Sequence, residues 1–112
     1  MENAKIEMLP LSNEKEIRMI NTEKLLAVKV EDYLCTFYIE AEEQFVCTKS
    51  LTEIEKILPE CFIKISRNTI INKNKCKSLR LKENKMILTS GDCFIYPKQN
   101  MKRIKELLGI KQ

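Results

Sequence analysis

The residues best suited to polar recognition lie together in residues 61–72, which read CFIKISRNTIIN. Ser66, Arg67 and Asn68 place one permanent cation beside short side chains that donate and accept hydrogen bonds. Two β-prone apolar runs flank them, so the stretch predicts a hairpin with a polar turn on a packed base. A packed base of this kind holds recognition side chains in a fixed orientation. An ordinary hairpin with a solvated tip is the alternative that this stretch leaves open.

The chain lacks the residue types that many enzymes use. It contains no histidine, which excludes Ser-His and Cys-His nucleophiles and an imidazole base. Its two glycines, Gly91 and Gly109, cannot form a glycine-rich phosphate loop. The five cysteines lie at wide spacing without a C-x-x-C motif, which favours core packing over metal binding or redox sensing. We therefore expect no catalytic site, no cofactor, no metal and no small-molecule substrate.

Size and hydropathy indicate one folded domain spanning residues 1–112, because 44% of the residues are hydrophobic and 32% are charged. No apolar run approaches the length of a transmembrane helix. The first residues also lack the basic and apolar regions of a signal peptide. These features predict a cytoplasmic protein without a membrane partner.

Charge is distributed unevenly along the chain. Residues 1–60 hold seven Lys/Arg and 13 Asp/Glu, a net charge of −6, whereas residues 61–112 hold 13 and three, a net charge of +10. A strongly basic half favours a polyanionic partner such as a nucleic acid. A solvated, lysine-rich surface would give the same balance, so charge alone leaves both interpretations open.

The elements that must position the polar turn are mostly strands. Runs of β-prone residues occur at 5–9, 16–20, 25–30, 33–40, 44–48, 62–65, 70–71, 76–81, 85–89 and 93–96. The short spacing between these runs favours antiparallel hairpins over parallel βαβ units. Pro10 is expected to end the first strand, and the strand at 25–30 is expected to be central.

Two helices complete the prediction. Ser50 and Glu53 fit a capping box, and apolar residues at spacings of three and four follow until Pro59 ends the helix. Pro97 suits the first turn of a second, basic helix, which Gly109 ends. The predicted fold class is therefore mainly β, with antiparallel sheets, one short mid-chain helix and a C-terminal helix.

With these elements in this order, the chain resembles the LytTR family, the β-stranded DNA-binding domain of many bacterial response regulators. The strongest likeness lies in residues 62–72, where an aromatic residue and a strand lead into Ser66-Arg67-Asn68, two isoleucines and Asn72. Supporting likenesses are the acidic strand end at 31–33, the capped helix at 50–59 and the basic helix start at 96–102. The likeness covers roughly residues 5–108.

The resemblance implies elongated antiparallel sheets that bind double-stranded DNA through turns in successive major grooves and regulate transcription. It also implies paired direct repeats as targets, on which two copies would meet. Carried over by position, the base-reading residues would be Asp32, Tyr33, Ser66, Arg67, Asn68, Lys98 and Gln99. The residues that neutralise phosphates would be Lys64, Lys73, Lys102 and Arg103.

The chemistry of these residue types agrees with such roles. Arg67 can make a bidentate contact to guanine, and Gln99 or Asn68 can pair with adenine. Tyr33 can pack on a thymine methyl group or hold a phosphate. Lys98 stands where the family commonly has arginine, and lysine contacts a phosphate without forking onto guanine. A solvated or ion-paired Arg67 and a sheet-edge Tyr33 are the structural alternatives.

The sequence also departs from the family pattern at two positions, and it leaves one alternative function open. The family usually has serine at Asn68, and Pro97-Lys98 replaces its common Ser-Arg pair. No receiver domain precedes the domain, so we expect a stand-alone protein or a fragment of a longer regulator. The alternative function is a protein-interaction module that binds a partner regulator through its acidic half, or a binder of RNA or another polyanion. Asn72 is expected to hold a turn in place.

Overall fold

The computed structural model describes residues 8–110, which form ten strands in three antiparallel sheets. The first sheet pairs β1 (Met8–Ser12) with β2 (Ile17–Asn21). The central sheet, in the order β5-β4-β3-β7-β6, contains β3 (Leu25–Glu31), β4 (Leu34–Ile39), β5 (Glu43–Cys47), β6 (Phe62–Ser66) and β7 (Thr69–Asn72). The third sheet, in the order β10-β9-β8, contains β8 (Cys76–Arg80), β9 (Lys85–Leu88) and β10 (Cys93–Ile95).

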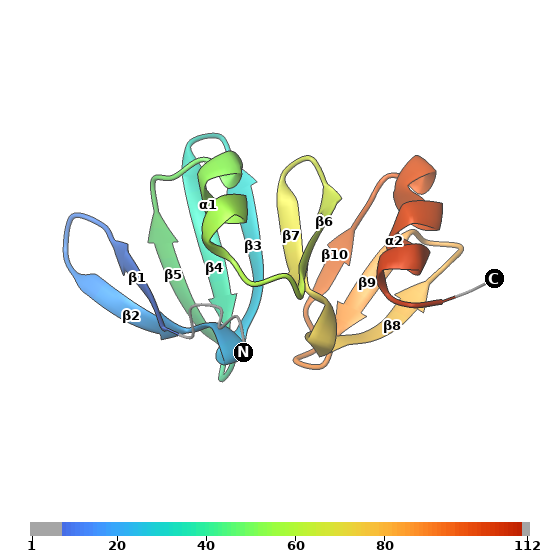
Figure 1. Ribbon diagram of the computed structural model, residues 1–112, viewed down its shortest axis with the longest axis horizontal. Helices are drawn as coiled ribbons and strands as arrows, with labels where there is room; N and C mark the ends of the chain where they lie inside the picture. The colour runs from blue at the N-terminus through green and yellow to red at the C-terminus, as the bar shows by residue number, and fades with distance from the viewer. Residues whose placement is uncertain (1–7, 111–112) are drawn as a thin grey trace, which may run out of the picture.

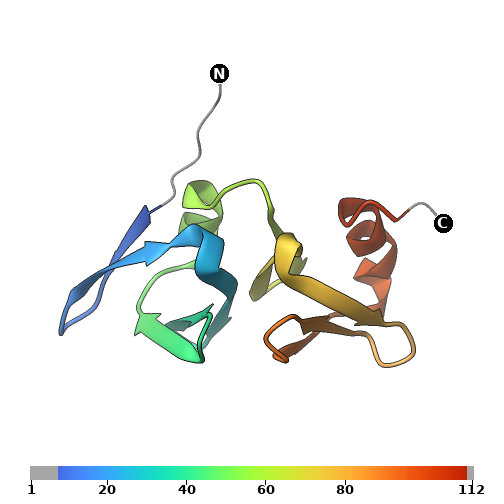
Figure 2. The same cartoon turned by 90° about the horizontal axis from the view of Figure 1, so that it is seen from below.

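Short helices connect and cover these sheets. The α-helices are α1 (Leu51–Ile57) and α2 (Met101–Leu107), and the 3-10 helices are η1 (Thr22–Lys24), η2 (Lys73–Lys75) and η3 (Lys98–Asn100). The sheets lie in a row in Figure 1, and they follow one another in the same way when seen from below in Figure 2. The mainly β fold class with a mid-chain and a C-terminal helix is confirmed, as is the central position of the strand at 25–30.

Several element boundaries differ from the prediction, and three of the differences concern Pro10, Tyr33 and the start of the second helix. Pro10 does not end the first strand but lies inside β1, opposite Met19. Among the described residues β1 pairs with β2 alone, which makes it an edge strand, where proline is tolerated. Residues 5–7 of the predicted strand lie outside the described residues. Tyr33 lies in the turn before β4, and the second helix begins as the 3-10 turn η3.

Two asparagines form matching corners between sheets. The Oδ1 atom of Asn21 accepts a hydrogen bond from the Glu23 N–H at 2.9 Å, and that of Asn72 accepts one from the Asn74 N–H at 3.0 Å. Each bond caps a 3-10 helix that leads the chain from one sheet to the next. Asn72 also donates from Nδ2 to the Leu25 carbonyl at 3.0 Å, so its predicted structural role is confirmed.

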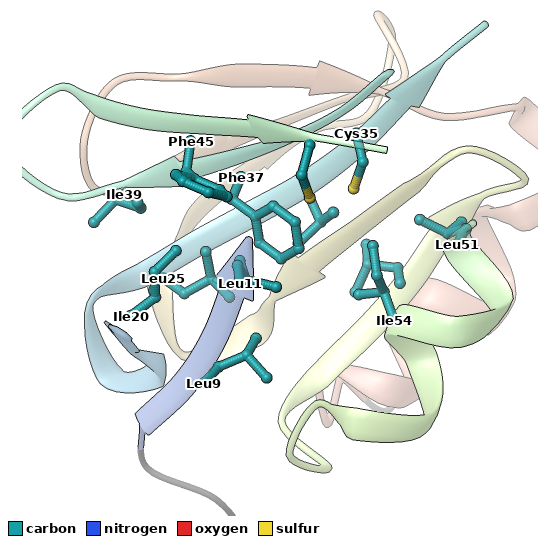
Figure 3. Packing of buried hydrophobic residues seen from close by; sticks show 13 residues of the cluster. Leu9, Leu11, Ile20, Leu25, Cys35, Phe37, Ile39, Phe45, Leu51 and Ile54 are labelled. Atoms are coloured by element: carbon teal, nitrogen blue, oxygen red, sulfur yellow. The ribbon is translucent and has the colours of Figure 1, made fainter. Parts of the chain in front are cut away.

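Buried side chains form two clusters. In the first, Leu9 and Leu11 of β1 pack with Phe37 of β4 and Ile54 of α1 (Figure 3). The second joins the central sheet to the third sheet and α2, and includes Leu26, Ile65, Met86, Phe94 and Ile104. Neighbours along β7 point to opposite faces, so Ile70 enters the first cluster and Ile71 the second. The apolar runs of the central strands therefore reflect burial on both faces.

Candidate functional site

The turn after β3 and the turn before β7 project from the same end of the central sheet. The two strands are antiparallel neighbours, with Lys29 opposite Thr69, and the Val30 N–H donates to the Asn68 carbonyl at 2.9 Å. Figure 1 shows both turns at the upper ends of their strands, and η3, between β10 and α2, lies on the same side. We call residues 32–33, 67–68 and 97–99 together the turn end of the molecule.

The β6–β7 turn is held by hydrogen bonds among its own side chains. Ser66 lies opposite Thr69, and two residues connect the strands. Asn68 Oδ1 accepts hydrogen bonds from Ser66 Oγ at 2.8 Å and from Thr69 Oγ1 at 3.0 Å. Arg67 is exposed and, within residues 8–110, makes no ion pair or hydrogen bond. Its guanidinium therefore projects freely from a turn whose base is fixed.

The β3–β4 turn consists of Asp32 and Tyr33, both exposed. Asp32 has a φ of 57°, in the left-handed region where aspartate is enriched among non-glycine residues. This conformation lets two residues reverse the chain between paired strands. Tyr33 is 85% exposed, so nearly its whole ring is available to a partner.

A groove connects the β6–β7 turn with the start of η3. Its lining residues are Lys29, Ser66, Arg67, Asn68, Thr69, Phe94, Ile95, Tyr96, Pro97, Gln99 and Asn100. One wall is polar and comes from the turn, and the other includes Phe94, Ile95 and Pro97. Gln99 lines the groove, whereas Lys98 is exposed beside it. The structure thus brings Ser66, Arg67, Asn68 and Gln99 together.

The four residues predicted to neutralise phosphates separate into two pairs. Lys102 and Arg103 are exposed in the first turn of α2, directly after η3. Lys64 faces α1, with its Nζ 3.9 Å from Glu55 Oε2. Lys73 lies at the opposite end of β7 from Arg67, where its Nζ donates to the Leu107 carbonyl at 3.5 Å. Lys102 and Arg103 therefore lie beside the turn end, and Lys64 and Lys73 do not.

Lys29, Ile95 and Asn100 are among the groove residues that were not predicted as site residues. Lys29 lies in β3 with its Nζ 3.6 Å from Glu31 Oε2, and Ile95 is 67% exposed on β10. Asn100 donates from Nδ2 to the Ile65 carbonyl at 3.0 Å. No local pattern identifies these residues, because the groove forms between segments about 30 residues apart in the chain. An alternation signal did exist for Ile95, which points away from the core between Phe94 and Tyr96.

The described residues hold no cluster of metal ligands, and two of their cysteines, Cys35 and Cys47, are buried. Within 8–110, no three Cys, Asp or Glu side chains gather closely enough to hold a metal ion. Burial, followed by the neighbouring Cys47, raises the pKa of the Cys35 thiol to about 12, and burial also raises the pKa of Cys47. Protonated, buried thiols of this kind are weak nucleophiles and metal ligands. No helix in this range is long and apolar enough to span a membrane.

Within residues 8–110, antiparallel sheets present polar and basic side chains on turns and on the short helix η3, an arrangement that defines a β-scaffold domain. The chain belongs to the family of LytTR DNA-binding domains, whose family model matches residues 15–109. The chain is therefore a DNA-binding domain, because the family is described by DNA binding and not by an enzymatic activity.

Individual relatives agree with this assignment. The chain is 33% identical over 100 residues to an uncharacterized HTH-type transcriptional regulator of Staphylococcus aureus (strain NCTC 8325 / PS 47), covering 87% of this chain and 67% of that protein. It is 28% identical over 114 residues to the sensory transduction protein LytR of Staphylococcus epidermidis, covering 98% of this chain and 45% of that protein. A solved LytTR DNA-binding domain from Bacillus cereus matches with a TM-score of 0.77 at 21% identity, covering 93% and 98% of the two chains.

The helix-turn-helix in the first relative's name has no counterpart within residues 8–110. Strands β6 to β10 separate α1 from α2, so the two helices do not form a consecutive pair.

Proposed function

We propose that the chain recognises specific duplex DNA by placing the turn end in the major groove, and that it regulates transcription in this way. One observation carries the proposal: Arg67, on a fixed turn, shares a groove with Gln99, and the turn of Asp32 and Tyr33 projects from the adjacent strand. The major groove is wide enough to admit elements of this size and offers a distinct donor and acceptor pattern for each base pair.

Arg67 is the strongest candidate for reading a base. Its guanidinium has no partner within residues 8–110, so binding to DNA breaks no existing ion pair. Two parallel N–H donors match the O6 and N7 acceptors of guanine, and such a bidentate contact discriminates against other bases by about 1–3 kcal/mol. The hydrogen-bonded base of the turn limits the motion of its backbone, which lowers the entropy that binding must remove.

The hydrogen bonds of Asn68 distinguish it from Gln99. A bidentate contact to adenine needs one acceptor and one donor from the same amide. The Oδ1 of Asn68 already accepts from two hydroxyl groups, so this side chain has its N–H donors left to offer. We therefore assign adenine reading to Gln99 and assign Asn68 to an acceptor, either a base atom or a phosphate oxygen. Ser66 supports the turn in this scheme.

Phosphate contacts would set the register of the domain on the duplex. Lys98 within the turn end, and Lys102 and Arg103 beside it, are exposed and suit this role. Lys64 and Lys73 contribute less, because one faces Glu55 and the other lies at the far end of β7. Binding of two copies to paired direct repeats is part of the proposal and is supported by the family likeness.

The test starts with selection of a binding site from random duplexes by the wild-type protein. Affinities of wild type, Arg67→Ala and Lys24→Ala are then measured by fluorescence anisotropy on the selected duplex and on a scrambled one. Lys24 is a matched control, because it is exposed in η1, at the opposite end of β3 from Tyr33. Arg67→Ala should lose about 1–3 kcal/mol on the selected duplex and relax the preference at one base pair. If Arg67→Ala kept the wild-type ratio of affinities, the assigned surface would be wrong.

A second candidate function is binding of a partner protein through the N-terminal half. The favouring observation is the outer face of the first sheet, where Ile17 is 73% exposed and Met19 is 54% exposed. The salt dependence of binding to random duplex DNA separates the two functions. Counterion release makes log affinity fall linearly with log salt. A flat response, or no binding at low salt, would favour the partner protein.

A further inference from the structure

A β-bulge interrupts the pairing of β6 with β7 just before the Arg67 turn. Lys64 pairs with Ile70 and Ser66 pairs with Thr69, so Ile65 is an extra residue without a partner on β7. β6 is also an outer strand of the central sheet. A bulged residue is left out of the regular hydrogen-bond ladder, and a buried carbonyl there needs a donor from elsewhere.

Asn100 supplies that donor. Its Nδ2 lies 3.0 Å from the Ile65 carbonyl oxygen and joins segments 35 residues apart in the chain. Asn100 is the last residue of η3 and lines the same groove as Arg67 and Gln99. Ile65 is fully buried, so water does not easily replace the amide.

We propose that Asn100 is a positioning residue that fixes the distance and orientation between the two halves of the turn end. The hydrogen bond starts next to Gln99 and ends two residues before Arg67, so it spans the gap between these proposed base-reading residues. This inference rests on the proposed function and adds a residue that does not itself touch a base.

The buried contacts between these parts are apolar, and a further polar contact, from Lys73 Nζ to the Leu107 carbonyl, lies at the other end of α2. Ile65, Phe94 and Ile104 belong to the second buried cluster, which holds the third sheet and α2 against the central sheet. Apolar burial is non-directional, so it favours contact without fixing one orientation. A hydrogen bond is directional and weakens steeply away from linear geometry. Asn100 therefore fixes an alignment that the apolar cluster stabilises but does not specify.

Loss of this alignment should affect specific binding more than general binding to DNA. Non-specific affinity comes from phosphate neutralisation, which tolerates small shifts of a side chain. Base reading requires Arg67 and Gln99 to meet their base edges at the same time. A misaligned η3 therefore lowers the ratio of specific to non-specific affinity, while the salt dependence stays unchanged.

The experiment compares the wild-type chain with Asn100→Ala, Asn100→Gln and the control Asn74→Ala. Asn74 is exposed at the corner beyond the far end of β7. Affinities are measured on the selected and the scrambled duplex over a range of salt concentrations. Asn100→Ala should lower the affinity ratio about 3- to 10-fold, the range expected for one lost hydrogen bond. The slope against log salt should match wild type, and Asn74→Ala should leave both quantities unchanged.

Each outcome decides the inference. Equal losses on both duplexes, or an unchanged ratio, would overturn it. If Asn100→Ala does not fold, Asn100→Gln decides, because it keeps the amide but lengthens its reach and should lower the ratio in a folded protein. The double variant Arg67→Ala/Asn100→Ala should lose less specific binding free energy than the two single variants lose in sum, because both substitutions affect the same alignment. If the wild-type protein binds the selected and the scrambled duplex equally, the proposed function fails. If Arg67→Ala loses specificity as expected but Asn100→Ala keeps the wild-type ratio of affinities, this inference alone is rejected.

Discussion

Replacing Asn72 by alanine tests whether the corner between the central and third sheets stabilises the fold as its geometry indicates. Asn72 is 2% exposed and is one of few buried polar residues in the described chain. Its Nδ2 donates to the Leu25 carbonyl at 3.0 Å, and its Oδ1 accepts from the Asn74 N–H at 3.0 Å. Alanine removes both hydrogen bonds without adding a competing group.

The two hydrogen bonds contribute differently to the free energy of unfolding. Leu25 is fully buried, so its carbonyl loses a donor that water cannot easily replace. A buried polar group left without its partner destabilises a protein by about 1–3 kcal/mol. Loss of an asparagine cap typically adds about 1 kcal/mol. Asn72→Ala should therefore lower the free energy of unfolding by about 2–4 kcal/mol, a large part of the roughly 5–15 kcal/mol of a typical domain.

Asn21→Ala is the matched control, because Asn21 caps η1 in the same way. Its side chain has no bond corresponding to the one that Asn72 makes to Leu25, among the contacts described for residues 8–110. Urea unfolding followed by far-ultraviolet circular dichroism gives both values, with the m-value as a check on two-state behaviour. Asn21→Ala should lose about 1 kcal/mol. Equal losses in the two variants would refute the assigned role of the Leu25 contact.

Three further predictions concern binding and stability. Lys102→Ala should weaken binding to all duplexes evenly and reduce the slope of log affinity against log salt by about 1, measured by anisotropy; a sequence-dependent loss would contradict its role as a phosphate contact. Burial raises the pKa of Cys35 from 9.0 to about 12, so the thiol proton is released first in the unfolded chain. The free energy of unfolding should therefore be unaffected below pH 9 and fall as the pH rises toward 12, with a smaller fall in Cys35→Ala. Ser50→Ala breaks the capping box with Glu53 and should cost about 1 kcal/mol in urea unfolding, while Thr52→Ala, on the exposed side of α1, should cost less.

The sequence predicted the hairpins well because their information is local. The β6–β7 turn could be located from four polar residues between two apolar runs, and the structure places a two-residue turn there. The capping box of Ser50 and Glu53 formed as predicted, since both partners lie within one helical turn. Runs of β-prone, apolar residues also located the central strands. In each case the residues that decide the conformation are neighbours in the chain.

The groove could not be predicted because it depends on how separate sheets meet. The contact between Asn100 and Ile65 depends on a bulge in β6 and on the docking of the third sheet, neither of which has a local signature. The same limit explains Lys73. Its charge suggested a phosphate contact, but the corner after β7 turns it toward the end of α2. The charge of a segment indicates the sign of the charge on its partner, whereas the topology decides at which end of the molecule the charged side chains lie.

The two halves of the turn end are held by different forces, and this difference bears on how such a domain could change specificity. β3 and β7 are hydrogen-bonded neighbours about 5 Å apart, so backbone bonds between these strands fix the turns of Tyr33 and Arg67 relative to each other. Gln99 reaches the same end through an apolar cluster and the Asn100 side chain. A single substitution cannot move the first two turns relative to each other without breaking the central sheet. Substitutions at the interface with the third sheet can move Gln99 while that sheet stays intact, so the η3 side is the part of this surface that sequence change can adjust at the lowest cost in stability.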